Sequence, residues 1–404
     1  MSNLPVVCIF GVKNISLKSE GPVPYFETDD MDCRCYLTDD NLSGVLAYDR
    51  PSVIVSFGKE EDFVNLMASP FSVRKKWIHF PDTGNIEGIG IEAFRCFLHN
   101  AVNDRQDLPL ISVFTPAYKT GSKIMKPFSS LLSQTYPDWE WVIIDDSDDD
   151  GETFSSLSEI ADSDPRVRVY KNSKHSGVIG SVKGDACALC RGSILVELDH
   201  DDEIVPQALE WLFNAYTSHP DVGFVYTDFA ECFEDGTPWE YGPGWGMGYG
   251  SYRTEEYGGI EYKVVNSPHV NAKVVRHIVA MPNHIRSWRT DVYRQIGGHG
   301  NTIHVADDYE LMLRTFLNTR MGHIPRMGYV QYRNETGNTH QVRNAEIQRL
   351  VRYFSQYYDD RIHERLLELG VDDFVWKEGE LTFAKLLSIP NQEPESHCTI
   401  RIDV

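Results

Sequence analysis

The chain has 404 residues, of which 41% are hydrophobic and 12% aromatic, so it can build packed cores and is long enough for two domains. Its 60 acidic side chains outnumber the 38 basic ones and give a formal net charge of −22. This excess disfavours nucleic acid as a partner, because a phosphate backbone binds to a basic surface.

The first 13 residues have no basic region before their apolar stretch and no small-residue cleavage site, so we expect no signal peptide. The sequence also has no apolar run of about 18 residues, so we expect no transmembrane segment and a soluble, cytoplasmic protein. Its eight cysteines are then reduced thiols. The pairs Cys33/Cys35 and Cys187/Cys190 have spacings that could bind zinc, but burial of small residues explains them more simply.

The first hundred residues predict a small α/β domain. Apolar, β-rich runs predict strands at 6–12, 52–57 and 76–80, and helical patterns cover 60–67 and 92–102. The polar run 103–107 can bury little and is the expected linker, so this domain covers residues 1–107. Its role could be acceptor binding, subunit pairing or bracing of the next domain.

From residue 108 strands and helices alternate regularly. We expect strands at 111–115, 139–144, 167–170 and 193–198, with helices at 125–134 and 180–190. This order is typical of β-α-β units and predicts an α/β fold with a mixed, mainly parallel central sheet. Ligands of such sheets bind at the carboxyl ends of the strands, where the polar clusters of this sequence fall.

The later parts of the chain are less regular. Glycine and aromatic residues dominate 241–262, which predicts either a long loop over an active site or an ordered aromatic segment without a catalytic part. Beyond residue 340, helices are expected at 345–357 and 360–369, followed by a tail.

An acidic cluster follows the strand at 193–198. Asp199, Asp201 and Asp202 come within four residues, and carboxylates this close raise one another's pKa unless a cation or solvent separates them. Oxygen ligands suit Mg²⁺ or Mn²⁺, which also bind phosphate oxygens. The cluster therefore predicts either a metal-diphosphate site or a solvated turn.

Four ordered motifs place this cluster in a wider pattern. They are Thr115-Pro116-Ala117-Tyr118, Gln134-Thr135-Tyr136, Asp145-Asp146-Ser147 and Leu198-Asp199-His200-Asp201-Asp202. With them, residues 108–340 resemble the family 2 glycosyltransferases, which have the GT-A fold and invert the anomeric centre. The resemblance does not reach the first hundred residues. Residues 341–404, beyond it, are the predicted C-terminal helices and tail.

The resemblance implies roles for individual residues. The nucleotide-sugar donor would contact Thr115, Pro116, Tyr118, Asp145, Asp146, Lys183 and Asp199. The metal would be bound by Asp201 and Asp199, with His340 as a further ligand in the position some relatives use. One departure is that the helix before the metal motif reads Ser181-Val182-Lys183-Gly184 where the family often has Arg-Asn.

The run Asp307-Asp308-Tyr309-Glu310 resembles the helix start that carries the family's catalytic base. Asp308 matches the base, and Asp307 replaces the more common Glu. Acidic residues in a first turn also simply stabilise the helix dipole, so a structural role is the alternative. The segment before this helix resembles the acceptor side, to which we assign His284, Trp288 and Arg289; Trp288 could equally be buried in the core.

These residues together predict a metal-dependent, inverting glycosyltransferase. It would move a sugar from a nucleotide diphosphate donor, most simply a UDP-sugar, to a hydroxyl of a glycan or glycoprotein, with Mn²⁺ or Mg²⁺ on the diphosphate and Asp308 as the base. A nucleotidyltransferase or pyrophosphorylase is the alternative enzyme, but residues 118–122 are a poor match to the glycine-rich basic loop it needs. A sugar-nucleotide-binding module without catalysis is the third hypothesis.

Overall fold

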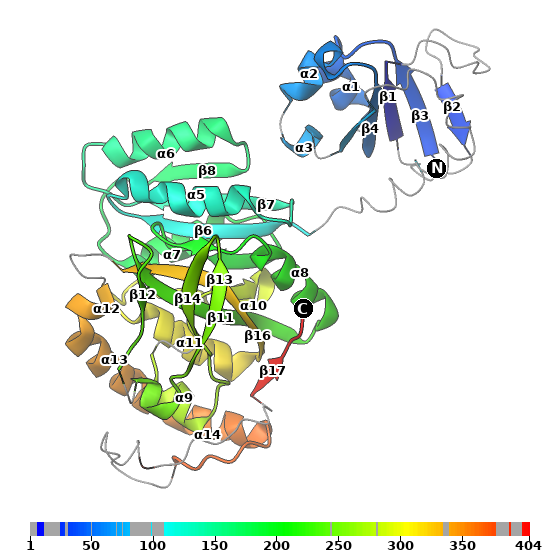
Figure 1. Cartoon of the computed structure of the whole chain (residues 1–404). Coiled ribbons are helices and arrows are strands. Elements are labelled where there is room, and N and C mark those ends of the chain that lie inside the picture. The colour runs from blue at the N-terminus through cyan, green and yellow to red at the C-terminus, as the bar shows by residue number, and fades with distance from the viewer. Residues whose placement is uncertain are drawn as a thin grey trace. The chain divides into compact units, whose positions relative to one another are not determined.

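The computed structural model describes residues 6–11, 25–28, 31–49, 51–69, 71–74, 76–80, 98, 109–242, 245–279, 282–333, 339–376, 388 and 398–404. The chain divides into two compact units, Met1–Leu108 and Pro109–Val404. Each unit has its own sheet (Figure 1). The helix expected at 92–102 (apart from residue 98) and the linker expected at 103–107 lie outside the described residues.

The first unit contains a five-stranded sheet in the order β2-β3-β1-β4-β5. Its strands are β1 (Val6–Phe10), β2 (Tyr25–Thr28), β3 (Met31–Tyr36), β4 (Val53–Phe57) and β5 (Trp77–Phe80). The pairs β1–β3, β1–β4 and β4–β5 are parallel, whereas β2 is antiparallel to β3. The β-branched runs of β1 and β4 are buried, as expected for the central strands of a parallel sheet.

The helices of this unit are α1 (Leu42–Tyr48), α2 (Val64–Met67) and α3 (Phe71–Arg74), with a 3₁₀ turn, η1 (Glu60–Asp62). The strands β2 and β3 were not predicted. Cys33 and Cys35 lie on β3, both buried in one hydrophobic cluster with Val7 and Val53. Cys187 and Cys190 are buried in a cluster of the second unit, and burial raises the pKa of both thiols. This supports the simpler reading of these cysteines as buried small residues.

The second unit has a sheet whose main path is β10-β16-β11-β15-β9-β6-β7-β8. Its strands are β6 (Ile111–Ala117), β7 (Trp139–Asp145), β8 (Val167–Lys171), β9 (Ile194–Glu197), β10 (Glu203–Ile204), β11 (Val222–Phe233), β15 (Arg286–Arg289) and β16 (Arg320–Arg333). Of the seven pairings along this path of described strands, four are parallel, including all three in the run β9-β6-β7-β8. The expected α/β class with a mixed, mainly parallel sheet is confirmed.

Helices pack against this sheet, and Figure 1 shows α5, α6 and α7 beside the strands β6 to β8. The helices are η3 (Gly121–Ile124), α5 (Met125–Leu132), α6 (Glu152–Ser163), α7 (Ile179–Leu189), α8 (Ala208–Ser218), α9 (Ala272–His277), α10 (Thr290–Gln295) and α11 (Asp307–Asn318). A large core cluster joins α7, α11, β9 and β15 around the fully buried Trp288. It fixes the starts of α7 and α11, which border the candidate site described below.

The prediction of a long loop at 241–262 is wrong for its second half. β13 (Tyr252–Tyr257) and β14 (Ile260–Val265) form an antiparallel hairpin, and β14 also pairs with β11. The turn residues Gly258 and Gly259 have φ of 60° and 79°, a conformation that glycine adopts without strain and that suits a two-residue hairpin. The first part follows β12 (Pro238–Trp239), and its described residues, 240–242 and 245–251, contain the 3₁₀ helix η4 (Trp245–Gly248) and no strand.

The C-terminal segment contains α12 (Thr339–Val342), α13 (Asn344–Tyr357) and α14 (Asp359–Glu368). The expected tail ends in a strand, β17 (Thr399–Arg401), which pairs in parallel with β16, so the tail prediction is corrected there. Among the helices of the described residues, none combines the length and the apolar character needed to cross a bilayer.

Candidate active site

A cavity of about 900 Å³ opens at the carboxyl ends of β6, β7 and β9. Its walls come from the end of β6, the first turn of α7, the acidic turn after β9, the segment that enters β15, and the start of α11. These are the places where polar side chains were expected from the order of strands and helices. Pro116, Tyr118, Asp146, Lys183, Asp199, Asp201, His284, Asp307 and Asp308 all line this cavity.

One end of the cavity is built around Tyr118 and Asp146. The rings of Tyr118 and His175 lie 5.2 Å apart, and both line the cavity. The Asp146 carboxylate accepts hydrogen bonds from the side chain of Asn172 (2.7 Å) and from the backbone N–H groups of Ser176 (2.8 Å) and Gly177 (3.2 Å). Asp146 therefore also holds the loop that forms this wall, and His175 is a site residue that the sequence did not reveal.

Two residues expected in the nucleotide pocket are buried beside it. Thr115 is fully buried, and its hydroxyl donates to the Leu198 carbonyl (2.6 Å) and accepts from the Trp141 indole (2.8 Å). Asp145 is also fully buried, and its Oδ1 accepts from the Ser147 backbone (3.0 Å). Successive side chains of a strand alternate between faces, so a whole motif cannot face one pocket. Neither residue lines the cavity, so their contact with the nucleotide stays a prediction, and the Oδ2 atom of Asp145 is buried without a hydrogen-bond partner.

The acidic turn separates its three carboxylates. Asp199 and Asp201 line the cavity, and the Asp199 side chain is 29% exposed. Asp202 is buried and accepts hydrogen bonds from the Tyr329 hydroxyl (2.9 Å) and the Tyr332 backbone (2.7 Å). Burial, with Asp201 and Asp199 nearby, raises the pKa of Asp202 well above its ordinary value. Asp202 therefore anchors the turn to β16, and unlike Asp199 and Asp201 it does not line the cavity.

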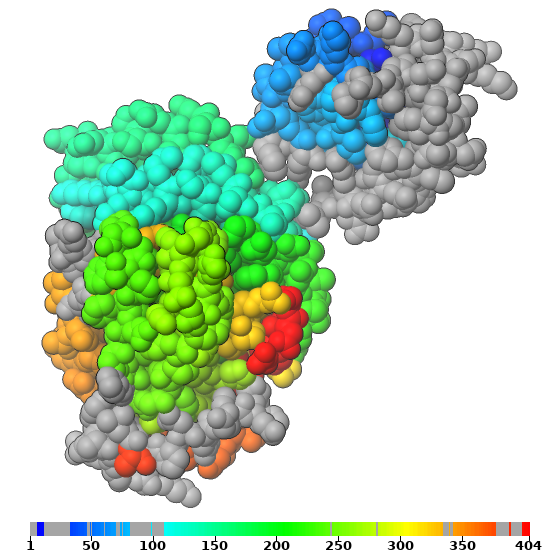
Figure 2. All heavy atoms as spheres, in the orientation of Figure 1, coloured from blue at the N-terminus to red at the C-terminus, as the bar shows by residue number. Residues whose placement is uncertain are grey.

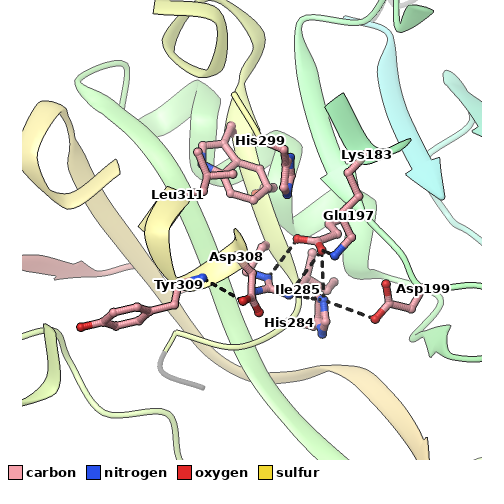
Figure 3. Close-up of polar contacts among 12 residues, drawn as sticks. Lys183, Glu197, Asp199, His284, Ile285, His299, Asp308, Tyr309 and Leu311 are labelled. Atoms are coloured by element: carbon pink, nitrogen blue, oxygen red, sulfur yellow. Dashed lines mark hydrogen bonds and ion pairs between the residues drawn. The ribbon is translucent and has the colours of Figure 1, made fainter. Parts of the chain in front are cut away.

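Behind this turn lies a buried network of charges (Figure 3). Glu197 forms ion pairs with Lys183 and with Arg286, whose Nε lies 3.0 Å from Glu197 Oε2. Burial alone would raise the pKa of Glu197, but Arg286 and Lys183 outweigh it and hold that pKa well below the ordinary value. Lys183 borders the cavity, but its ammonium already forms an ion pair with Glu197. A diphosphate would therefore have to share the Lys183 ammonium with Glu197.

Glu197, Asp199 and His284 bring ligand atoms within 4.8 Å of one another, a spacing suited to a cation. Two contacts argue against this trio. Glu197 is already neutralised by two cations, and His284 Nε2 lies 2.7 Å from the Arg286 guanidinium, which can only donate. That bond occupies the lone pair a metal would need. Asp199 and Asp201 both line the cavity, and their role as metal ligands stays a prediction.

The two acidic residues at the start of α11 differ in their surroundings. Asp308 is 32% exposed, its Oδ2 lies 2.8 Å from Arg286, and its Oδ1 accepts from the Tyr309 backbone. Burial would raise the pKa of Asp308, but Arg286 and Lys183 lower it overall, so this carboxylate is ionised at neutral pH. Asp307 is 5% exposed, and burial raises its pKa to about 6 against the opposing effect of Lys183.

Two acceptor-side assignments are corrected. Trp288 is fully buried, and its indole N–H donates to the Thr315 hydroxyl (3.1 Å). Arg289 donates to the carbonyls of Val222 (2.9 Å) and Tyr216 (2.6 Å). Neither residue lines the cavity, because Trp288 is in the core and the Arg289 guanidinium binds backbone carbonyls. His340 lies in α12, but its side chain is outside the described residues.

Residues 112–270 match the model of the Glycosyl transferase family 2. Residues 112–270 form a family 2 glycosyltransferase domain. The match includes Asp146, Lys183, Glu197, Asp199 and Asp201, while the start of α11 lies beyond it. The sequence resemblance that pointed to this family is thereby confirmed, and with it the fold class of the second unit.

Two curated relatives are named as enzymes of this kind. The chain is 26% identical over 267 residues to a chondroitin synthase of Escherichia coli, covering 66% of this chain and 34% of that protein. It is 28% identical over 120 residues to the E. coli enzyme named UDP-Glc:alpha-D-GlcNAc-diphosphoundecaprenol beta-1,3-glucosyltransferase WfgD, covering 30% of this chain and 46% of that protein. The chain thus spans less than half the length of each of these relatives.

Solved structures are more distant. The S. aureus TarS 1-349 complex with UDP-GlcNAc is 17% identical, with a TM-score of 0.46 over 64% of this chain and 72% of that chain.

Proposed function

We propose that this chain is an inverting glycosyltransferase that moves a sugar from a nucleotide diphosphate donor, in the simplest case a UDP-sugar, to a hydroxyl of a glycan or glycoprotein. The observation that carries this proposal is that one cavity is lined by Tyr118 with Asp146, by Asp199 with Asp201, and by the ionised Asp308. The name of the WfgD relative, a UDP-Glc transferase, favours uridine as the base.

The proposed step is a single displacement. The acceptor hydroxyl oxygen attacks the anomeric carbon of the donor, and the bond from that carbon to the diphosphate breaks with its electron pair leaving on the diphosphate. The hydroxyl proton passes to Asp308, whose pKa Arg286 keeps low enough for the carboxylate to be ionised before the reaction. The partly exposed position of Asp308 on the cavity wall supports this role.

The residues on the cavity wall fit a divalent cation. Asp199 and Asp201 offer hard carboxylate oxygens, the donor type that Mg²⁺ and Mn²⁺ prefer, and the buried charges behind them are already paired. A bound ion would offset the negative charge of the diphosphate. His340 remains our candidate for a further ligand, and mutation to Ala with a measurement of metal affinity tests it.

The proposal is tested by assaying purified protein with a panel of UDP- and GDP-sugars and measuring release of nucleoside diphosphate. We expect release with Mn²⁺ or Mg²⁺ and none in excess EDTA, and a loss of about 100-fold or more in both Asp201→Asn and Asp308→Asn. Asp221→Asn, which removes one partner of an exposed ion pair with Arg320, is the matched control and keeps full activity.

Each competing function predicts a different product. A nucleotidyltransferase releases pyrophosphate from a nucleoside triphosphate and a sugar phosphate, and a binding module takes up the donor without releasing any product. Full activity in both the Asp201 and the Asp308 variants would remove these residues from the mechanism.

A further inference from the structure

The cavity reaches α13, a helix that the proposed reaction does not use. Asn344, Ile347 and Gln348 of this helix line the cavity. Ile347 also belongs to the core cluster that contains Leu311 of α11, so α13 packs against the helix whose first turn carries the proposed base, Asp308. Figure 1 shows α12 and α13 at one side of the second unit, and Figure 2 shows part of this orange segment on the surface.

The cavity-lining side of α13 continues onto the protein surface. Residues four positions apart form one ridge of a helix surface, so Asn344 and Gln348 are followed along a ridge by Arg352 and Gln356, both of which are exposed. With a rise of roughly 1.5 Å per residue the ridge extends over about 18 Å, which is longer than one sugar ring. Within the described part of the chain, the amides of Asn344 and Gln348 have no hydrogen-bond partner, so they are free to bind hydroxyls.

Two arginines on and beside this ridge have no acidic partner in the described part of the chain. Arg349 and Arg352 are both exposed, and three positions apart they are neighbours on the helix. The single acidic residue of α13, Glu346, is already paired with Arg343. Like charges on neighbouring positions of a helix are unfavourable. Two such arginines on a chain with a net charge of −22 therefore point to a negatively charged ligand.

The same exposed face of α13 carries two tyrosines. Tyr353 is 58% and Tyr357 is 70% exposed, and their ring centroids lie 6.3 Å apart, so they form one continuous exposed surface. Tyrosine offers apolar ring carbons and a hydroxyl, which suit the C–H groups and hydroxyls of a sugar. The exposed positions of α13 include no aliphatic residue larger than alanine. A membrane-binding helix needs such residues to insert, so this face fits a glycan better than a bilayer.

We propose that α13 binds an acidic acceptor glycan along the part of its chain that leaves the cavity. The amides of Asn344 and Gln348 bind hydroxyls of the sugar unit next to the reaction centre. Arg349 and Arg352 pair with carboxylates of the units behind it, because a guanidinium matches a carboxylate with two parallel N–H donors. The substrate class is therefore a glycan with uronic acid units. This inference rests on the proposed function, since it takes the reacting acceptor hydroxyl to lie at Asp308.

The test measures binding of acidic and neutral hexasaccharides to the whole protein by isothermal titration calorimetry at low salt. The probes are hexagalacturonate, hexamannuronate and, as the neutral comparison, maltohexaose. We expect an acidic probe to bind more tightly than maltohexaose. Its Kd is expected to rise about tenfold in the double variant Arg349→Gln with Arg352→Gln, the effect of losing two exposed ion pairs. Added salt is expected to weaken the binding of the acidic probe to wild type.

The variants are chosen to keep the fold. Glutamine has nearly the helix propensity of arginine and both arginines are exposed, so the thermal unfolding temperature of the double variant is expected to match wild type. Arg326→Gln, which replaces an exposed arginine of β16 outside the cavity, is the matched control and keeps the wild-type Kd. Gln348→Met keeps the length of the side chain but removes its hydrogen bonds, and is expected to raise the Kd of the acidic probe about fivefold.

The outcomes separate the two proposals. Wild-type protein that releases nucleoside diphosphate from no donor contradicts the proposed function. Release of nucleoside diphosphate without any preference for an acidic probe, or with a preference that the double arginine variant keeps, overturns the inference on α13 alone. Binding to vesicles that contain phosphatidylserine, lost in the double variant and without binding of a hexasaccharide, identifies a membrane surface as the ligand and also overturns it.

Discussion

Replacing Glu197 with Gln tests the buried charge network directly. Glu197 is fully buried and is the shared partner of Lys183 and Arg286, so the change keeps the shape but removes the one carboxylate that forms ion pairs with both cations. Removing one partner of a buried ion pair typically costs about 3–5 kcal/mol, because the remaining charge stays desolvated. We expect a loss in the free energy of unfolding within this range.

The assay is urea unfolding at pH 7, followed by circular dichroism and by tryptophan fluorescence. Asp221→Asn is the control, since its exposed pair with Arg320 is worth about 1 kcal/mol at most. The double variant Lys183→Met with Glu197→Gln removes the uncompensated ammonium as well, so we expect it to be more stable than Glu197→Gln alone. A loss below about 1 kcal/mol in Glu197→Gln would refute the reasoning, because it would mean that water already solvates this network.

Three further predictions follow from the same contacts. Trp288→Ala, which empties the centre of a large core cluster, is expected to destabilise the chain by about 3–5 kcal/mol in urea unfolding, whereas a role in the acceptor site would instead raise acceptor KM at unchanged stability. Burial lowers the pKa of His299 to about 3. Below about pH 6.5 the histidine is therefore protonated in the unfolded state but not in the folded state, and the free energy of unfolding falls as the pH drops from about 6.5 towards 4. His299→Asn, which can keep the contact with Tyr293, is expected to remove up to about 1.4 kcal/mol of that loss per pH unit, and an unchanged slope relative to wild type contradicts the assignment. Mn²⁺ at about 100 times its Kd is expected to stabilise wild type by about 2.7 kcal/mol in thermal unfolding and Asp201→Asn by much less; equal stabilisation of both places the ion elsewhere.

The sequence was most informative where local pattern alone determines the structure. The runs at β6, β7 and β9 are apolar and end in polar residues, and each strand was predicted to within two residues of its observed ends. The hairpin β13–β14 was missed although Gly258-Gly259 separates two β-prone segments, which is a recognisable hairpin signal. The many glycine and aromatic residues at 241–262 favoured the prediction of a loop over that of a hairpin.

The site was less predictable because its geometry depends on distant parts of the chain. Asp199 and Asp201 were recognised from one motif, but Asp202 differs from them only through Tyr329 and Tyr332, more than a hundred residues later. Likewise, the pairing of Glu197 with Arg286 joins residues 89 positions apart. For other residues, the position on the strand determines whether the side chain lines the cavity. Thr115 and Trp288 are buried in the interior, whereas Pro116 and Arg286 border the cavity.

The charges around the cavity favour the divalent cation that we propose for this site. Lys183 and Arg286 form ion pairs with Glu197 and Asp308, and Asp307 and Asp199 add negative charge around the same two cations. Asp199 and Asp201 lie on the cavity wall, and among the described residues that line this cavity the carboxylates outnumber the two cations Lys183 and Arg286. A nucleotide diphosphate brings further negative charge to the same place, and like charges at such distances are strongly unfavourable in a partly desolvated cavity. A divalent ion held by Asp199 and Asp201 would offset this charge, so we expect donor affinity and metal affinity to fall together in Asp201→Asn.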